Sequence, residues 1–290
     1  MAGTALVLGG GGLTGIGWEI GMLAGLADAG IDLADADVVI GTSAGSIVGA
    51  HLTSQRHTLA ELYDHQLAGP DGESSTRNGE PTARMGLAAF TRFAGIALRS
   101  RDAVSFGARM GKLALAARTA PEKEQRAAIA RTLGGLTDWP ARRLMITAVD
   151  ASTGQRTAFD DTSGVTLIDA VGASCAVPGI YPPVTIDGTR WIDGGVHSSA
   201  NADLAAGYAR VVVVAPMAVS GGPIAGPRSQ GDRLARQGAR VCVITPDRAA
   251  RSAFGRNVLD PSKRAAAAHA GRRQAAAHAT EVRHIWSAKN

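Results

Sequence analysis

The chain has 290 residues, of which 45% are hydrophobic, 19% charged and 4% aromatic. This composition excludes disorder over most of the chain, and the length suffices to bury a sizeable core, so we expect one domain over residues 1–290. The net charge of +5 favours anionic partners, but the scarcity of aromatic residues and the lack of zinc-finger or RNA-recognition spacing argue against nucleic acid.

The first 55 residues predict two strand-turn-helix units. Residues 4–8 are typical of a buried strand, followed by a glycine loop and an apolar-periodic helix to about residue 29. Residues 37–40 predict a second strand, and the small residues of 46–52 suit a helix packed on a sheet. Repeated units of this kind indicate an α/β fold with a mostly parallel sheet.

The middle of the chain changes character, and residues 58–131 predict a helical insertion. Its polar stretch 69–81 is rich in Gly, Pro, Ser, Asp and Glu and predicts a loop. Residues 84–101 set apolar side chains among four arginines, as in a basic amphipathic helix. Such a helix either packs one face on the core with its arginines in water, or forms a lid or membrane contact.

The second half returns to strands. Asp187-Gly188 between two apolar segments predicts a hairpin over 184–192, and residues 220–227 predict a Gly/Pro loop. Residues 250–290 predict a C-terminal helix, with Asp260-Pro261 as its start signal. The other expected strands are 144–149, 155–159, 211–215 and 240–245.

The sequence carries few signals for a cellular compartment or for membrane insertion. Cys175 and Cys242 are the only cysteines and neither stands at metal-ligand spacing from His or Cys, so the sequence predicts no metal site and fits a reducing compartment. The N-terminus has no basic segment ahead of its apolar residues, unlike a signal peptide. The apolar run 211–219 is too short to span a bilayer. We therefore expect a cytoplasmic protein with at most peripheral contact at an anionic membrane.

Gly41-Thr42-Ser43-Ala44-Gly45 is a G-x-S-x-G motif between a predicted strand and a predicted helix, the context of a nucleophile elbow. The glycines Gly41 and Gly45 would let strand and helix approach closely. The helix N-terminus would favour a developing oxyanion next to Ser43. The alternative is a turn whose serine only caps the helix.

The glycine loop from Gly9 to Gly15 can present several backbone N–H groups to one point, for a phosphate or an oxyanion. It also matches the dinucleotide-binding pattern, which needs an acidic residue at the end of the second strand. That strand runs into Gly41 instead, and Asp32 and Asp35 precede it. Nucleotide binding is therefore the weaker alternative.

Asp193-Gly194-Gly195 ends the hairpin strand, and by itself this is a common turn. A serine hydrolase usually has a histidine base. His197 is the candidate by proximity to Asp193, unless Asp193 pairs with a histidine near the C-terminus. We expect His197 to be a loop residue without a catalytic role. A histidine-dependent esterase is kept as an alternative.

The glycine loop, the elbow and the Asp193-Gly194-Gly195 motif, in this order, resemble the patatin-like phospholipases. Residues 173–183 look like that family's proline-bearing segment ahead of its aspartate, and residues 201–203 look like the sequel. The resemblance spans about residues 3–215. It implies a three-layer αβα fold with a central, mostly parallel sheet. Residues 58–131 and 220–290 match the family poorly, so its acyl-chain pocket and lid cannot be carried over to this chain.

The resemblance also implies a catalytic Ser-Asp dyad without histidine. Ser43 would attack an ester carbonyl, Asp193 would take its proton, and the amides of Gly10, Gly11 and Gly12 would form the oxyanion hole. A carboxylate with a reference pKa of about 3.9 is a weak base, so we expect a desolvated Asp193 with a raised pKa. Gly15, Gly41, Gly45, Gly194 and Gly195 would support the motifs.

The expected substrates are lipid esters such as phospholipids, lysophospholipids or glycerides, with no cofactor and no metal. Where the family often has Arg or Lys, this chain has Thr14, which puts charge assistance in doubt. A catalytically silent lipid-binding or scaffold protein of the same fold is the main alternative, and intact Ser43 and Asp193 argue against it.

Overall fold

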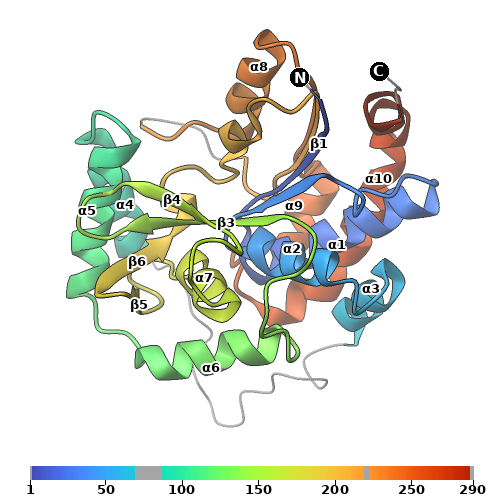
Figure 1. Ribbon diagram of the computed structural model, residues 1–290. Helices are drawn as coiled ribbons and strands as arrows, with labels where there is room; N and C mark the ends of the chain where they lie inside the picture. Colours follow the sequence, from blue (N-terminus) through green and yellow to red (C-terminus); the bar gives the residue numbers. More distant parts are fainter. Residues whose placement is uncertain (1, 69–86, 219–222, 288–290) are drawn as a thin grey trace.

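A computed structural model describes residues 2–68, 87–218 and 223–287 of the chain (Figure 1). The predicted polar loop 69–81 lies outside these residues. Within them, eight strands form one sheet in the order β5-β6-β3-β2-β1-β7-β8, with β4 paired to β3. The strands are β1 Thr4–Leu8, β2 Val38–Gly41, β3 Leu144–Asp150, β4 Arg156–Phe159, β5 Val184–Ile186, β6 Thr189–Asp193, β7 Arg210–Val214 and β8 Arg240–Ile244.

The sheet is parallel in its middle and antiparallel at one side. Strands β3, β2, β1, β7 and β8 run parallel to one another. Strands β4 and β6 pair antiparallel with β3, and β5 pairs antiparallel with β6. The hairpin β5-β6 turns at Asp187 and Gly188, both at positive φ (48° and 78°), as the Asp-Gly pair predicts. The predicted strands and the mostly parallel α/β class are therefore confirmed.

Ten α-helices and three short 3-10 helices surround the sheet in the described ranges. The α-helices are α1 Gly12–Asp28, α2 Ala44–Ser54, α3 Leu59–Leu67, α4 Leu87–Leu98, α5 Ala103–Ala116, α6 Glu122–Thr132, α7 Leu167–Ser174, α8 Pro227–Arg236, α9 Arg248–Phe254 and α10 Arg264–Trp286. The 3-10 helices are η1 Gly194–Val196, η2 Ala202–Ala205 and η3 Pro261–Lys263.

Alternation along the central strands creates two separate cores. In β1, Leu6 and Leu8 belong to the large cluster shared with α1, α2 and α10, whereas Ala5 and Val7 point to the opposite face. On that face they pack with small residues of η2 and with Leu234 of α8. Because strand side chains alternate between faces, these strands are buried on both sides, and the layers are helix, sheet and helix.

Helices α1 and α10 lie side by side through glycine contacts (Figure 1). A Cβ at Gly21 of α1 would collide with the backbone carbonyl of Ala268, and one at Gly271 of α10 would collide with that of Trp18. Bringing the backbones this close buries Trp18 completely, and its Nε1 donates to Gln274 Oε1 at 3.1 Å. The C-terminal helix therefore belongs to the main core.

Two helices, α7 and α8, were not expected from the sequence, and α9 falls mostly within the segment 250–290 that was expected to form one C-terminal helix. Helices α7 and α8 are short, and their start signals are side chains or a proline within polar stretches, such as Thr166 accepting from Asp169 N and Pro227 at the first turn of α8. The predicted loop 220–227 thus ends where helix α8 begins, at Pro227. The single C-terminal helix over 250–290 is corrected, because Gly255 (φ 67°) ends α9. The helical segment that begins at Asp260-Pro261 is confirmed, with η3 and then α10 following that start signal.

The helical insertion 58–131 is helical in its described part, but its helices pack on different regions. Helix α3 begins with a capping box between Thr58 and Glu61 and packs on α1 and α10. Helix α5 packs on β3 and η1 instead, through Phe106 and Met110. None of the helices among the described residues combines the length and apolar character needed to cross a membrane.

Replacement of Gly21 by alanine tests the close contact between α1 and α10. The added Cβ meets rigid backbone, so we expect the free energy of unfolding to fall by about 2 kcal/mol despite the better helix propensity of alanine. Gly172→Ala in α7 is the control, because its Cβ would lie 3.6 Å from Val184 Cγ2, an ordinary contact. Urea denaturation measures both variants, and equal stabilities would contradict the packing argument.

Candidate active site

Strand register brings two distant motifs to the same place. In the β2–β3 pair Gly41 lies opposite Ile146, and in the β3–β6 pair Asp193 lies opposite Ala148. Ser43 is two residues beyond Gly41, and Ala148 is two residues beyond Ile146. Through its pairing with β2 and β6, strand β3 therefore places the serine turn and the aspartate at the same position along the strand direction.

Ser43 occupies a strained turn between β2 and α2. Its backbone has φ 52° and ψ −116°, which is unfavourable for a residue with a side chain. A Cβ at Gly45 would collide with the carbonyl of Leu8, so the turn needs glycine there. The Ser43 side chain does not cap α2, which contradicts the alternative that this serine only caps, and its backbone N–H donates to Ser174 Oγ at 2.8 Å.

The Ser43 hydroxyl donates to Asp193 Oδ2 at 2.8 Å. The other carboxylate oxygen of Asp193, Oδ1, accepts from the backbone N–H of Gly195 at 2.7 Å, which fixes the rotation of the carboxylate. Burial raises the pKa of Asp193 to about 6, although the hydrogen bonds from Gly195 and Ser43 lower it. This raised pKa agrees with the sequence-based expectation and gives the carboxylate more strength as a base.

The glycine loop lies against Ser43. A Cβ at Gly10 would stand 3.5 Å from Ser43 Cβ. The N–H of Gly10, however, donates to Ser199 O at 2.8 Å. This corrects the expectation for Gly10, because its donor is already used. Within the described residues the N–H groups of Gly11 and Gly12 have no acceptor, as is normal at the start of a helix.

Thr14 lies in the glycine loop, between Gly11 and Gly15. Its side chain is completely buried, and its hydroxyl donates to Gly11 O at 3.5 Å. Gly11 is also held by Gly15, whose N–H donates to the same oxygen at 2.9 Å. Thr14 therefore supports the loop backbone and does not face solvent.

The histidines that the sequence left open lie elsewhere. His269 contacts Tyr63, and His278 contacts Gln274, so neither pairs with Asp193. His197 follows η1 and is half-buried, and its Nδ1 has no hydrogen-bond partner among the described residues. Burial and then the Arg156 guanidinium lower the pKa of His197, so the ring is mostly neutral at pH 7.

Cys175 is a buried neighbour of the serine turn. Its Sγ lies 3.8 Å from Ser46 Oγ. Burial, and after it the Asp193 charge, raise the pKa of the Cys175 thiol to about 12. The thiol therefore stays protonated, which is the poorly nucleophilic form.

One group of metal-ligand side chains exists in the described ranges, away from the serine turn. Cys242 on β8 and His278 and Glu281 on α10 bring one ligand atom each within 4.8 Å of one another. One ring nitrogen of His278, Nε2, already lies 3.3 Å from Gln274 Nε2. Sequence spacing could not reveal this group, because the sheet and the helix that carry it are distant in the chain.

Together the fold and the site define an α/β protein with a buried serine–aspartate pair at a strand-to-helix turn. A family model described as "Patatin-like phospholipase" matches residues 6–206, well over half of the chain. The chain therefore belongs to the patatin-like phospholipase family, a class of lipid ester hydrolases.

The solved structures that are similar to the chain include VipD and ExoU. VipD from Legionella pneumophila is 13% identical with a TM-score of 0.49, and the match covers 98% of this chain and 67% of VipD. The type III effector protein ExoU is 16% identical with a TM-score of 0.43, and the match covers 97% of this chain and 53% of ExoU. No protein of curated function matches the chain in sequence.

Replacement of Asp193 by asparagine should stabilise the protein above pH 6. The folded pKa of about 6 lies above the ordinary aspartate value of 3.8, so ionisation costs the native state free energy. This cost is absent below about pH 4, grows between pH 4 and 6, and reaches about 3 kcal/mol at pH 8. Thermal melts should therefore show a larger gain in Tm for Asp193→Asn at pH 8 than at pH 4.5.

The exposed Asp161 provides the control for this comparison. Asp161→Asn should change Tm little at either pH. A gain for Asp193→Asn that is equal at pH 8 and pH 4.5 would contradict the assignment of a desolvated carboxylate.

Proposed function

We propose that the chain hydrolyses carboxylic esters of lipids, with Ser43 as nucleophile and Asp193 as general base. The observation that carries the proposal is the 2.8 Å hydrogen bond from Ser43 Oγ to Asp193 Oδ2. It connects a hydroxyl on a strained turn to a carboxylate whose pKa is raised towards neutrality. This is the arrangement that activates a serine without histidine.

The reaction proceeds in two halves. Asp193 takes the proton of Ser43 while Oγ attacks the ester carbonyl carbon, and the carbonyl π electrons move onto oxygen. Collapse of the tetrahedral intermediate breaks the bond to the alcohol, which leaves with the proton from Asp193. Water, deprotonated by the same carboxylate, then attacks the acyl-enzyme carbonyl carbon. Collapse of this second tetrahedral intermediate breaks the bond to Ser43 Oγ, Asp193 returns its proton to Oγ, and the fatty acid leaves.

The N–H groups of Gly11 and Gly12 are the proposed oxyanion donors. They stand at the start of α1, whose dipole favours negative charge, and the neighbouring Gly10 lies against Ser43. Gly10 contributes by its hydrogen bond to Ser199, which fixes the loop. The proposed chemistry assigns no metal and no cofactor.

Apolar side chains beside the dyad support a lipid substrate. Val196 follows the Asp193 motif and packs with Phe106 and Met110 of α5. At the end of α4, Leu98 is 88% exposed and is followed by Arg99 and Arg101. We propose that α4 and α5 form part of the acyl-chain site and that the end of α4 contacts anionic membranes.

A fluorophosphonate probe tests the nucleophile. We expect labelling of the wild type and none of Ser43→Ala, because the probe reacts with an activated serine. Turnover of p-nitrophenyl esters of graded chain length and of defined phospholipids should fall at least 1,000-fold, on the order expected for loss of a nucleophile, in Ser43→Ala and Asp193→Asn.

His197→Ala is the matched control for the base. It should retain turnover within about threefold, since the hydroxyl donates to Asp193 and not to a ring. Loss of turnover in His197→Ala would favour the histidine-dependent alternative. Absence of labelling in the wild type would favour a silent lipid-binding protein.

The pH dependence of kcat/KM should follow Asp193. The base must be ionised, so activity should rise with pH through the Asp193 pKa of about 6 and fall about tenfold per pH unit below it. Because the pKa of His197 is also lowered from 6.5, the profile is measured in His197→Ala as well. The fall of kcat/KM at low pH is the acid limb of this profile. If the acid limb disappears in His197→Ala, Asp193 is not the base.

A further inference from the structure

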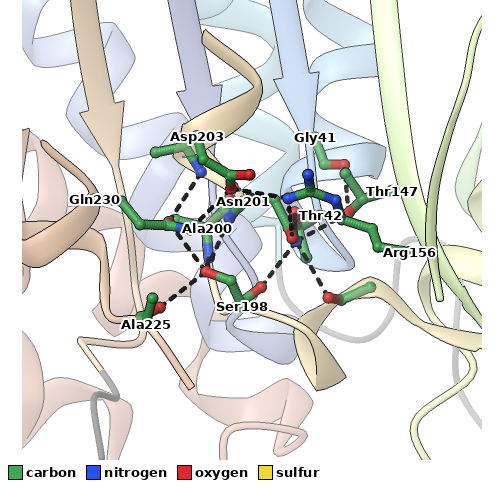
Figure 2. A network of polar contacts seen from close by, with 12 residues as sticks. Gly41, Thr42, Thr147, Arg156, Ser198, Ala200, Asn201, Asp203, Ala225 and Gln230 are labelled. Carbon is green, nitrogen blue, oxygen red and sulfur yellow. Dashed lines mark hydrogen bonds and ion pairs between the residues drawn. The ribbon is translucent and has the colours of Figure 1, made fainter. Parts of the chain in front are cut away.

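Asn201, which belongs to neither motif of the dyad, lies at the centre of a buried polar network (Figure 2). Its Nδ2 lies within hydrogen-bond distance of four acceptors: Thr42 Oγ1 at 3.1 Å, Thr147 Oγ1 at 3.2 Å, Gly194 O at 3.1 Å and Ser198 O at 2.8 Å. An amide has only two N–H hydrogens, so these contacts are shared.

Two of these acceptors are the direct neighbours of the dyad. Thr42 precedes Ser43, and Gly194 follows Asp193. Thr147 on β3 lies between them, and its hydroxyl is 2.9 Å from that of Thr42. A Cβ at Gly194 would collide with the Thr147 hydroxyl, so the aspartate turn lies directly against this group. One amide thus connects the serine turn to the aspartate turn.

The orientation of the Asn201 amide is fixed from its other side. Arg156 Nη1 donates to Asn201 Oδ1 at 3.2 Å and to Asp203 Oδ1 at 2.8 Å, so the oxygen of the amide faces a cation and the nitrogen faces the dyad motifs. Gln230 Nε2 donates to Asp203 Oδ1 at 2.8 Å, and Gln230 Oε1 accepts from Ser198 at 3.0 Å. Figure 2 shows this second layer around Asn201.

The backbone of Asn201 also suits the residue type. Its φ of 53° is left-handed, a conformation that asparagine tolerates better than most residues. The same segment holds the glycine loop, since Ser199 O accepts from Gly10 N–H. Residues 198–201 therefore contact all three motifs that the proposed reaction needs.

We infer that Asn201 is a positioning residue, which holds Thr42 and Gly194 together so that the hydroxyl and the carboxylate next to them stay in hydrogen-bond contact. The inference rests on the proposed function. The Asn201 side chain touches no reacting atom and acts only through the serine turn and the aspartate turn. Its loss should therefore impair the chemical step more than substrate binding.

Asn201→Gly is the first test variant, because glycine keeps the left-handed backbone and removes the amide without adding charge. We expect kcat for a p-nitrophenyl ester to fall about 100-fold, with KM changed less than about twofold. Because the Ser43 hydrogen bond lowers the Asp193 pKa, its loss should also move the acid limb of kcat/KM to higher pH. Asn201→Asp keeps the Arg156 contact and removes the donors, and should lose kcat similarly.

Gln274→Leu is the matched control. Gln274 is also a buried amide with several hydrogen bonds, to Trp18, Asp247 and Thr245, but it contacts neither dyad motif. It should lower Tm and keep kcat and the acid limb of the wild type at temperatures below its melting transition. This separates general stability from positioning.

The outcomes are distinct. Wild-type kcat and an unshifted acid limb in folded Asn201→Gly or Asn201→Asp overturn the inference and leave the proposed function intact, provided that the fluorophosphonate probe labels Ser43. A fall in kcat that Gln274→Leu shares also overturns it. If Asn201→Gly does not fold, Asn201→Asp decides the question by the same measurements. A wild type that neither labels nor turns over esters removes the proposed function, and this inference with it.

Discussion

The hydrogen bond between the Ser43 hydroxyl and the Asp193 carboxylate is the contact on which the site depends. Burial of Asp193 disfavours its charge and raises its pKa to about 6, while the donors from Ser43 and Gly195 keep it partly stabilised. A fully exposed carboxylate would be a weak base, and a buried one without donors would stay protonated. The observed environment lies between these limits.

Close approach of backbones makes this contact possible. Gly45 lies against the Leu8 carbonyl and Gly194 against Thr147, so the loops after β1, β2 and β6 meet with little side-chain volume between them. Strand β3 sets the level of both turns through its register with β2 and β6. The buried amide of Asn201 then joins the same turns from the other side. Rigid elements thus hold a strained turn in place.

Several features depart from the sequence-based expectations for physical reasons. Helices α7 and α8 are too short for a periodic apolar pattern to identify them. Gly255 with its positive φ divides the C-terminal segment, a break that the Ala-rich composition obscures. The donor of Gly10 is used by Ser199, a partner 189 positions away in the sequence that no local pattern could indicate.

By itself the sequence determined the α/β class, the strands and the three motifs, because strand periodicity, glycine turns and G-x-S-x-G are local signals. It also named Ser43 and Asp193 through a family resemblance. Only the tertiary structure decided which groups meet: the dyad contact, the free amides of the glycine loop, and the roles of Ser174 and Asn201. These depend on sheet register and on desolvation, which are properties of distant segments brought together.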